Sequence, residues 1–323
     1  MPGEDMTEQS LTPRSSAPQV WTATVAESKF YWYDLLVSGD ELPDFRDPVG
    51  RYLRRMQFAL DGTMEKRLLY CLVSRPRVRF DRQRNVSWGF FSLKLTVPVL
   101  IGVEERKSTI TLDIEVPFDA TFKKPLVQVQ DKFLILNWGS MFEPLSIHDL
   151  IQRYDTGLEF ASTVLYVGQT RDPDGKLAKG EAPLINRLRN TNSLENDTFL
   201  LIQRMEVQVD TTARDMSEEA SERTQVDVLE GALIAYFEGP SPRLRNAVEH
   251  GTRRERMAEL QDTYWLERMT VDLGFKEADS FYELKSEYAE QSRRHLFDCT
   301  FAEGRAACRR LGEQDRPLVG LRA

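Results

Sequence analysis

Apolar residues recur at every second position through much of residues 66–138, which is the spacing of half-buried β-strands. The segment Thr109-Ile-Thr-Leu-Asp-Ile-Glu-Val116 shows this alternation most clearly. Polar or proline-containing breaks separate the candidate strands, as at residues 81–85 and at Pro117. The pattern predicts an antiparallel, largely β region. Its expected strands are 67–73, 78–80, 87–97, 109–116, 126–129 and 133–138.

Helical spacing marks a second set of segments. Asp47 suits the cap of a short helix and Pro48 suits its first turn. Pro183 opens another helix in the same way. Helices are also expected at 146–154 and at 226–237, with strands at 163–167 and 198–209 between them. Past Pro240 the sequence predicts only helices, at 243–258, 259–269 and 280–310.

Length and composition indicate a soluble globular protein. The 323 residues allow two domains, and 41% are hydrophobic while 29% are charged. No apolar run approaches the roughly 20 residues needed to cross a bilayer. The start, Met1-Pro-Gly-Glu-Asp5, lacks the basic and apolar regions of a secretory signal. We therefore expect a cytoplasmic protein without a membrane partner, beginning with a disordered tail at residues 1–18 that is rich in Ser, Thr, Pro and Glu.

The cysteines and histidines are few and scattered. Cys71, Cys299 and Cys308 form no Cys-x-x-Cys pair, which argues against a disulfide framework and against structural zinc. His295 and Cys299 are four residues apart on an expected helix, but two ligands do not close a zinc site. Any metal is therefore expected to be a hard cation bound by carboxylate and water oxygens.

The net charge of −8 does not indicate a nucleic-acid-binding protein, because Lys and Arg make most of the contacts to phosphate. Arginines nevertheless gather in local groups, which leaves room for a basic face. These groups lie around residues 51–55, 75–84, 187–204 and 243–256.

Three segments carry the strongest chemical signal. A strand containing Tyr166-Val-Gly168 is followed by the short helix with Arg187-Leu-Arg189, and then by a helix containing Glu230-Gly-Ala-Leu-Ile234. This order of tyrosine, arginine and helical glutamate resembles the GIY-YIG nuclease domain over roughly residues 130–250. Asn246 resembles the asparagine that closes the family's motifs, although its spacing is a few residues longer.

The resemblance implies a small domain with a three-stranded antiparallel sheet flanked by helices. It assigns Glu230 to Mg²⁺ or Mn²⁺, Arg187 to the phosphate and Tyr166 to the attacking water, and Gly168, Arg189 and Asn246 would contact nucleic acid. These residue types suit phosphodiester hydrolysis, since a carboxylate holds a metal with its waters, and an arginine fork neutralises phosphoryl oxygens. Taken singly, each has an ordinary reading as a core, solvated or helix-start residue.

The family's first motif, a Gly-x-Tyr strand, is missing from the window before Tyr166. Two alternatives stay open. Tyr154 could supply the hydroxyl from a neighbouring position, or residues 133–139 could form the first strand, with 139–162 as an insertion. In the second case Asn137 or Trp138 stands at the usual tyrosine position.

These observations predict an α+β chain in consecutive parts: the tail at 1–18, a β-rich domain at 19–128, a GIY-YIG-like domain at 129–250 and a helical extension at 251–323. The expected function is a metal-dependent endonuclease acting on nucleic acid, in particular DNA, and analogy suggests a restriction or anti-phage setting. The N-terminal β domain would recognise substrate or a protein partner. The alternative is a catalytically degenerate scaffold subunit that binds nucleic acid or protein.

Overall fold

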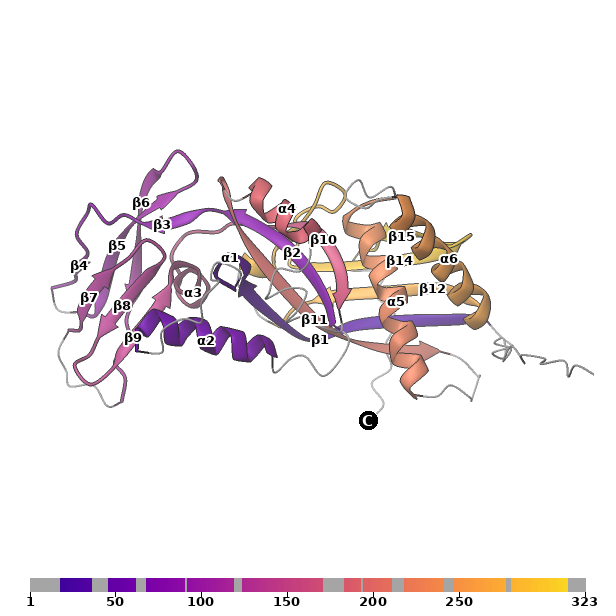
Figure 1. Cartoon of the computed structure of the whole chain (residues 1–323), viewed down its shortest axis with the longest axis horizontal. Coiled ribbons are helices and arrows are strands. Elements are labelled where there is room, and N and C mark those ends of the chain that lie inside the picture. Colours follow the sequence, from indigo (N-terminus) through magenta and orange to yellow (C-terminus); the bar gives the residue numbers. More distant parts are fainter. Residues whose placement is uncertain are drawn as a thin grey trace, which may run out of the picture. The chain divides into compact units, whose positions relative to one another are not determined.

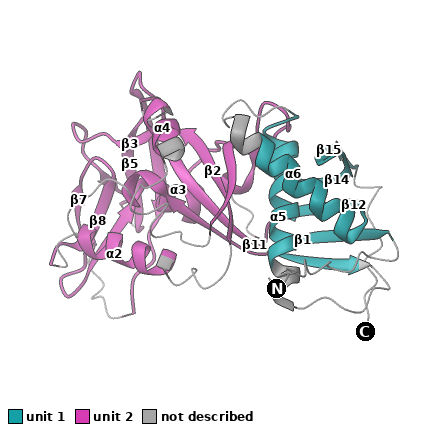
Figure 2. Cartoon of the chain, turned by 45° about the vertical axis from the view of Figure 1, so that its right-hand side comes forward, with its two compact units in different colours: residues 1–24, 205–273, 295–323 teal, residues 25–204, 274–294 magenta. Residues whose placement is uncertain are grey.

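A computed structural model describes most of the chain and shows a strand-rich protein that mixes helices and strands. The chain forms two compact units, coloured separately in Figure 2. The first unit takes residues 1–24, 205–273 and 295–323, and the second takes residues 25–204 and 274–294. The residues described are 18–36, 46–61, 68–90, 92–118, 124–170, 183–192, 194–210, 218–240, 247–276 and 280–312.

The central sheet of the second unit places β2 (Leu68–Pro76) between β10 (Ser162–Thr170) and β11 (Asn196–Asp210). β2 runs antiparallel to both neighbours, so that Leu72 lies opposite Tyr166 on one side and Leu200 on the other. On its other edge β10 pairs in parallel with β13 (Leu284–Lys285), which follows a 3-10 turn at Ser280–Tyr282. The long strands β1 (Gln19–Trp32) and β11 each contribute residues to both units.

Between β2 and β10 the chain forms two smaller antiparallel sheets (Figure 1). In β6 the buried Ile110 and Leu112 alternate with exposed threonines, so the predicted period of two is confirmed. One sheet contains β3 (Val78–Phe80), β4 (Ser87–Trp88), β5 (Lys94–Ile101) and β6 (Arg106–Asp113). The other contains β7 (Leu126–Val129), β8 (Phe133–Asn137) and β9 (Phe142–Ser146).

The expected helix starts of the second unit are confirmed by their caps. An oxygen of Asp47 accepts a hydrogen bond from the Gly50 amide at 2.9 Å, at the start of α2 (Pro48–Asp61). Ser146 and Asp149 form a reciprocal capping box at the start of α3 (Ile147–Arg153). The remaining helices of this unit are α1 (Tyr33–Leu36) and α4 (Pro183–Asn192).

One hydrophobic cluster joins β2, β11, β1 and the nearby helices α1 and α2. Tyr166 of β10 and Leu188 of α4 pack against its edge. The cluster therefore contacts β10 and α4, which carry Tyr166, Gly168, Arg187 and Arg189. Its buried members are Tyr31, Tyr33, Leu36, Leu60, Leu68, Tyr70, Leu72, Leu200 and Ile202.

The first unit combines α5 (Glu218–Phe237) and α6 (Ala247–Tyr264) with β12 (Leu266–Gly274), β14 (Arg294–Ala302) and β15 (Arg305–Arg310). Residues 19–24 of β1 pair in parallel with β12, and β14 lies between β12 and β15. Helix α5 contacts both β15 and α6. The methyl group of Met257 on α6 lies over Gly231 of α5, in the space that a Cβ atom would occupy.

The expected helical extension is wrong beyond residue 264. Residues 266–274, 284–285, 294–302 and 305–310 are strands, and the two units interleave in sequence rather than following one another. In β14 the positions 295, 297, 299 and 301 are buried while 300 and 302 are exposed, which is a period of two. The Glu303-Gly304 pair that follows has positive φ values of 51° and 70°, as a two-residue hairpin turn requires.

The expectation that no disulfide forms is also wrong. Cys299 and Cys308 lie directly opposite each other in the β14–β15 hairpin and are bonded. His295 lies on the same strand, buried, with its Nδ1 atom 3.0 Å from the hydroxyl of Tyr236. Within the described residues, none of the helices is both long and apolar enough to cross a membrane.

Candidate functional site

Two tyrosines from neighbouring strands lie together over a glycine in the second unit. Tyr70 of β2 pairs in register with Gly168 of β10, and the rings of Tyr70 and Tyr166 are 6.2 Å apart between centroids. A Cβ atom on Gly168 would lie 2.7 Å from the Tyr70 hydroxyl and 2.8 Å from the Tyr166 ring. Gly168 is therefore required for this close approach within a strand.

Tyr70 lies on the strand that pairs with β10, although the sequence predicted a different neighbour for that strand. The strand expected at 133–139 is β8, which pairs with β7 and β9 rather than with β10. Tyr154 caps the C-terminus of α3, where its amide donates to the carbonyl of Leu150, and residues 155–161 form no strand. The alternative that residues 133–139 form the strand beside β10 is therefore wrong, and a role for the Tyr154 hydroxyl stays a prediction. The strand that neighbours β10 is instead β2, which begins at Leu68 and contains Tyr70, far upstream in the sequence.

Helix α4 brings two arginines to the edge of the same hydrophobic cluster. Leu188 packs against the cluster, Arg187 is exposed, and Arg189 is half-buried. Burial raises the pKa of Tyr33 to about 12, and the positive charge of Arg189 opposes that shift. Arg189 thus acts electrostatically on the cluster, while Arg187 is free to reach into solvent.

Glu230 belongs to the first unit, where it lies buried on α5. Its Oε1 atom is 3.1 Å from Nη2 of Arg253 on α6. Among the described residues no group of three or more His, Cys, Asp or Glu side chains gathers in metal-binding geometry. One carboxylate still fits Mg²⁺, which keeps several of its waters in protein sites. Asn246 lies outside the described residues.

The second unit also contains a buried ionic network that the sequence analysis did not find. Both oxygens of Asp197 accept hydrogen bonds of 2.7 Å from the guanidinium of Arg79. Nε2 of His148 lies 2.7 Å from the same carboxylate. The imidazole stands edge-on to Trp32 and Phe199, with ring centroids 4.4 and 4.7 Å away.

The charges within this network follow from its burial. Burial alone would raise the pKa of Asp197, but His148 and Arg79 outweigh it and hold the pKa well below its usual range. Burial lowers the pKa of His148, so the neutral ring donates its Nε2–H to the ionised Asp197. Nδ1 of His148 is buried with no hydrogen-bond partner in the described part of the chain. The trio therefore lacks the nucleophile of a catalytic triad and is a structural element.

A cavity of about 310 Å³ adjoins this network, with aromatic side chains such as Tyr31 and Phe281 in its wall. Tyr52 also lines it and donates a hydrogen bond to Ser146 at 3.4 Å. Comparisons with protein-family models, with curated proteins and with solved structures found no match to this chain. Its function therefore has to be argued from the residues themselves.

Proposed function

We propose that this chain is a metal-dependent endonuclease of the GIY-YIG type, which hydrolyses phosphodiester bonds in nucleic acid. The observation that carries the proposal is the Tyr70–Tyr166 pair over Gly168, on antiparallel neighbouring strands. The two name-giving motifs of that family lie on neighbouring strands, and Tyr70 supplies the tyrosine that the local sequence lacked. β11 lies antiparallel on the other side of β2, but these strands belong to an eight-stranded sheet, so the expectation of a separate three-stranded sheet is wrong.

Each side chain has a role in this proposal. The hydroxyl of Tyr166 orients the attacking water, and Tyr70 holds the Tyr166 ring in place. The exposed guanidinium of Arg187 offers a planar fork to the phosphate and binds more strongly as negative charge develops. Glu230 belongs to the first unit, whereas Tyr166 and Arg187 belong to the second, so the structure does not bring these three residues together. Glu230 remains the proposed ligand of Mg²⁺ or Mn²⁺, which would supply Lewis acidity to the phosphoryl group when bound. Gly168, Arg189 and Asn246 are proposed contacts to the nucleic acid.

The setting is part of the same proposal. We infer a DNA substrate and a cytoplasmic, defence-related role, in which the two small sheets between β2 and β10 contact the substrate or a protein partner. These sheets interrupt the catalytic sheet in sequence, as a recognition element added to a small nuclease would.

Cleavage of supercoiled plasmid, linear duplex, single strands and RNA, with and without chelator, tests the proposal. Glu230→Ala should abolish metal-dependent cleavage, and Arg187→Ala should reduce its rate by about 100-fold to 1,000-fold. Tyr166→Phe should also slow it. Tyr154→Phe is the comparison variant: normal cleavage would show that Tyr154, at the C-terminal cap of α3, takes no part, whereas slow cleavage would assign its hydroxyl to the site. Absence of cleavage for every substrate would overturn the proposal.

A degenerate scaffold subunit is the second candidate, and the Glu230–Arg253 ion pair favours it. A carboxylate already held by an arginine is a weaker metal ligand than an unengaged one. A scaffold would bind nucleic acid or a protein partner without cleaving it, and binding would be unchanged by chelator and by Glu230→Ala. The cleavage and binding assays together separate the two functions.

A further inference from the structure

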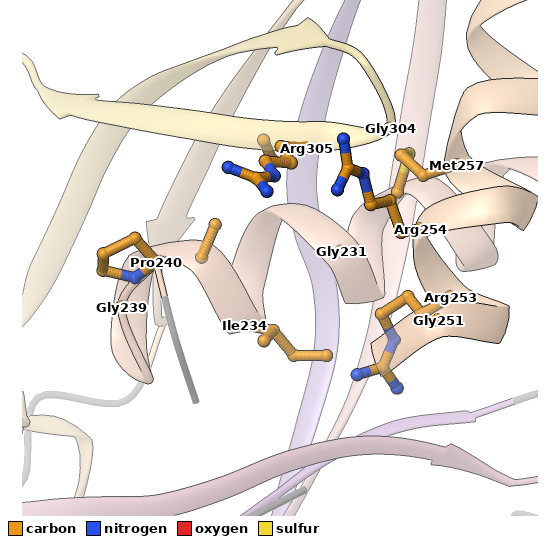
Figure 3. A pocket seen from close by; sticks show the side chains of 12 residues that line it. Gly231, Ile234, Gly239, Pro240, Gly251, Arg253, Arg254, Met257, Gly304 and Arg305 are labelled. Carbon is orange, nitrogen blue, oxygen red and sulfur yellow. The ribbon is translucent and has the colours of Figure 1, made fainter. Parts of the chain in front are cut away.

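We propose that an arginine-lined cavity in the first unit binds successive phosphates of a nucleic-acid backbone. The choice of nucleic acid over other phosphate carriers rests on the proposed nuclease function. The cavity has a volume of about 600 Å³. Figure 3 shows Arg253, Arg254 and Arg305 projecting around the same space from α6 and from the start of β15.

The lining of this cavity is cationic. It contains three arginines, and no Asp or Glu side chain occurs among the described residues that form it. Nη2 of Arg253 binds Glu230, while Nη1 of the same guanidinium is buried without a hydrogen-bond partner in the described part of the chain. A buried donor left unsatisfied is costly, and a phosphate oxygen is the acceptor that an arginine fork fits best. Phosphate would therefore relieve an existing deficit at Arg253.

Arg254 and Arg305 have donors to spare as well. Nε of Arg254 donates to the backbone carbonyl of Glu303 at 3.1 Å, which leaves its terminal nitrogens available. Its Nη2 lies 3.9 Å from the Glu303 carboxylate, whose side chain is 86% exposed. Exposed pairs of this kind contribute about 0–1 kcal/mol, so a phosphate can displace the carboxylate. Arg305 is exposed at the first position of β15.

The backbone brings these arginines together through a glycine. Gly304 has φ of 70° in the turn between β14 and β15, and a Cβ atom there would collide with the carbonyl oxygen of Arg254. The turn can therefore lie directly against α6, which places Arg305 beside Arg254. Because the cavity is much larger than one phosphate and its cations stand on two different elements, it suits a run of phosphodiesters.

Binding of a short labelled DNA duplex, followed by anisotropy in chelator to prevent cleavage, tests this inference. Arg305→Gln and Arg254→Gln should each weaken binding several-fold, and each should reduce the slope of log affinity against log salt by about one. Arg309→Gln is the matched control, since Arg309 is exposed on the same strand but does not line the cavity. Glu303→Gln should strengthen binding, because it removes the competing carboxylate.

Competition identifies the source of the phosphate. Single-stranded or duplex DNA should displace the label, whereas inorganic phosphate and pyrophosphate should do so only at far higher concentrations. Unchanged affinity and salt slope in both cavity variants would overturn the inference, as would equal displacement by inorganic phosphate. Binding that depends on these arginines but is not followed by cleavage would support the phosphate-binding cavity and contradict the nuclease function. The failure of one proposal can therefore be told from the failure of the other.

Discussion

Asp197 in the second unit and Glu230 in the first are both buried carboxylates held by an arginine, yet they are held differently. Asp197 is 1% exposed, and Arg79 binds both of its oxygens while His148 adds a third contact. Glu230 is bound by Arg253 through one oxygen, and the Arg253 side chain is 27% exposed and lines a cavity. An ion pair that is fully buried, as at Asp197, which we call closed, stabilises the fold. One whose arginine is partly exposed, as at Glu230, which we call half-open, keeps donors available for a ligand.

The largest effect is expected where the closed network is broken. Asp197→Ala removes the buried carboxylate from Arg79 and leaves it only Asp131, which is 3.4 Å from its Nε and 55% exposed. The loss of a buried ion-pair partner costs about 3–5 kcal/mol. Urea unfolding should show this as a lower free energy of unfolding for the second unit. A cost below about 1 kcal/mol would mean that the network is not closed and would remove the contrast with Glu230.

Breaking the half-open pair should cost less. Arg253→Ala leaves Glu230 short of one hydrogen-bond donor, for which about 1–3 kcal/mol is expected. Urea unfolding again provides the measurement, with Arg254→Ala as a neighbouring control that exposes no buried group. If Arg253→Ala destabilised the protein more than Asp197→Ala, the two pairs would have been ranked in the wrong order.

Acid should affect the closed network in two stages. His148 has a lowered pKa in the folded protein, so its contribution to stability is complete above the unfolded value of about 6.5 and is lost as the pH falls below it. Asp197 has a lowered pKa too, so a further loss begins below about pH 4. Urea midpoints measured as a function of pH check both stages. His148→Gln should flatten the first stage while leaving the second.

The smallest effect is expected from an ion pair on the surface. Nε of Arg293 lies 2.7 Å from Glu283, but the two side chains are 54% and 19% exposed. Water and salt screen such a pair, so Arg293→Ala should change the free energy of unfolding by only about 0–1 kcal/mol. A thermal or urea transition indistinguishable from wild type is the expected result. A large decrease in the free energy of unfolding would show that the distance between the charges, and not their burial, determines how much an ion pair stabilises this protein.

Local chemistry allowed much of the fold to be predicted. The caps at Asp47 and Ser146 are set by residues within one turn, and the strands at 78–80 and 126–129 are marked by their own alternation and breaks. The helix expected at 280–310 is wrong, because this segment forms strands at 284–285, 294–302 and 305–310. The alternation around Phe297 and the Glu303-Gly304 turn were the better signals.

The candidate site was predictable only in part, for reasons of distance along the chain. Tyr166 and Gly168 stand in a recognisable local motif, but their neighbour Tyr70 is separated from them by two complete sheets. Register between distant strands leaves no trace in either strand alone. The same holds for Arg79 and Asp197 and for the cavity arginines, which come from separate segments of the chain. The sequence of one such segment does not indicate which distant residues it contacts.

The interruption between β2 and β10 has a consequence for the history of the gene. Ser74 lies opposite Thr163, so the chain departs from the central sheet and rejoins it at adjacent points, as an acquired cassette would. Yet Arg79 and His148 lie inside this inserted segment, while Asp197, which they bind, lies outside it. Replacement of this inserted segment by an unrelated one would leave Asp197 buried without Arg79 and His148, so residue 197 would have to change as well. The insert and its host are therefore expected to have been inherited as a pair.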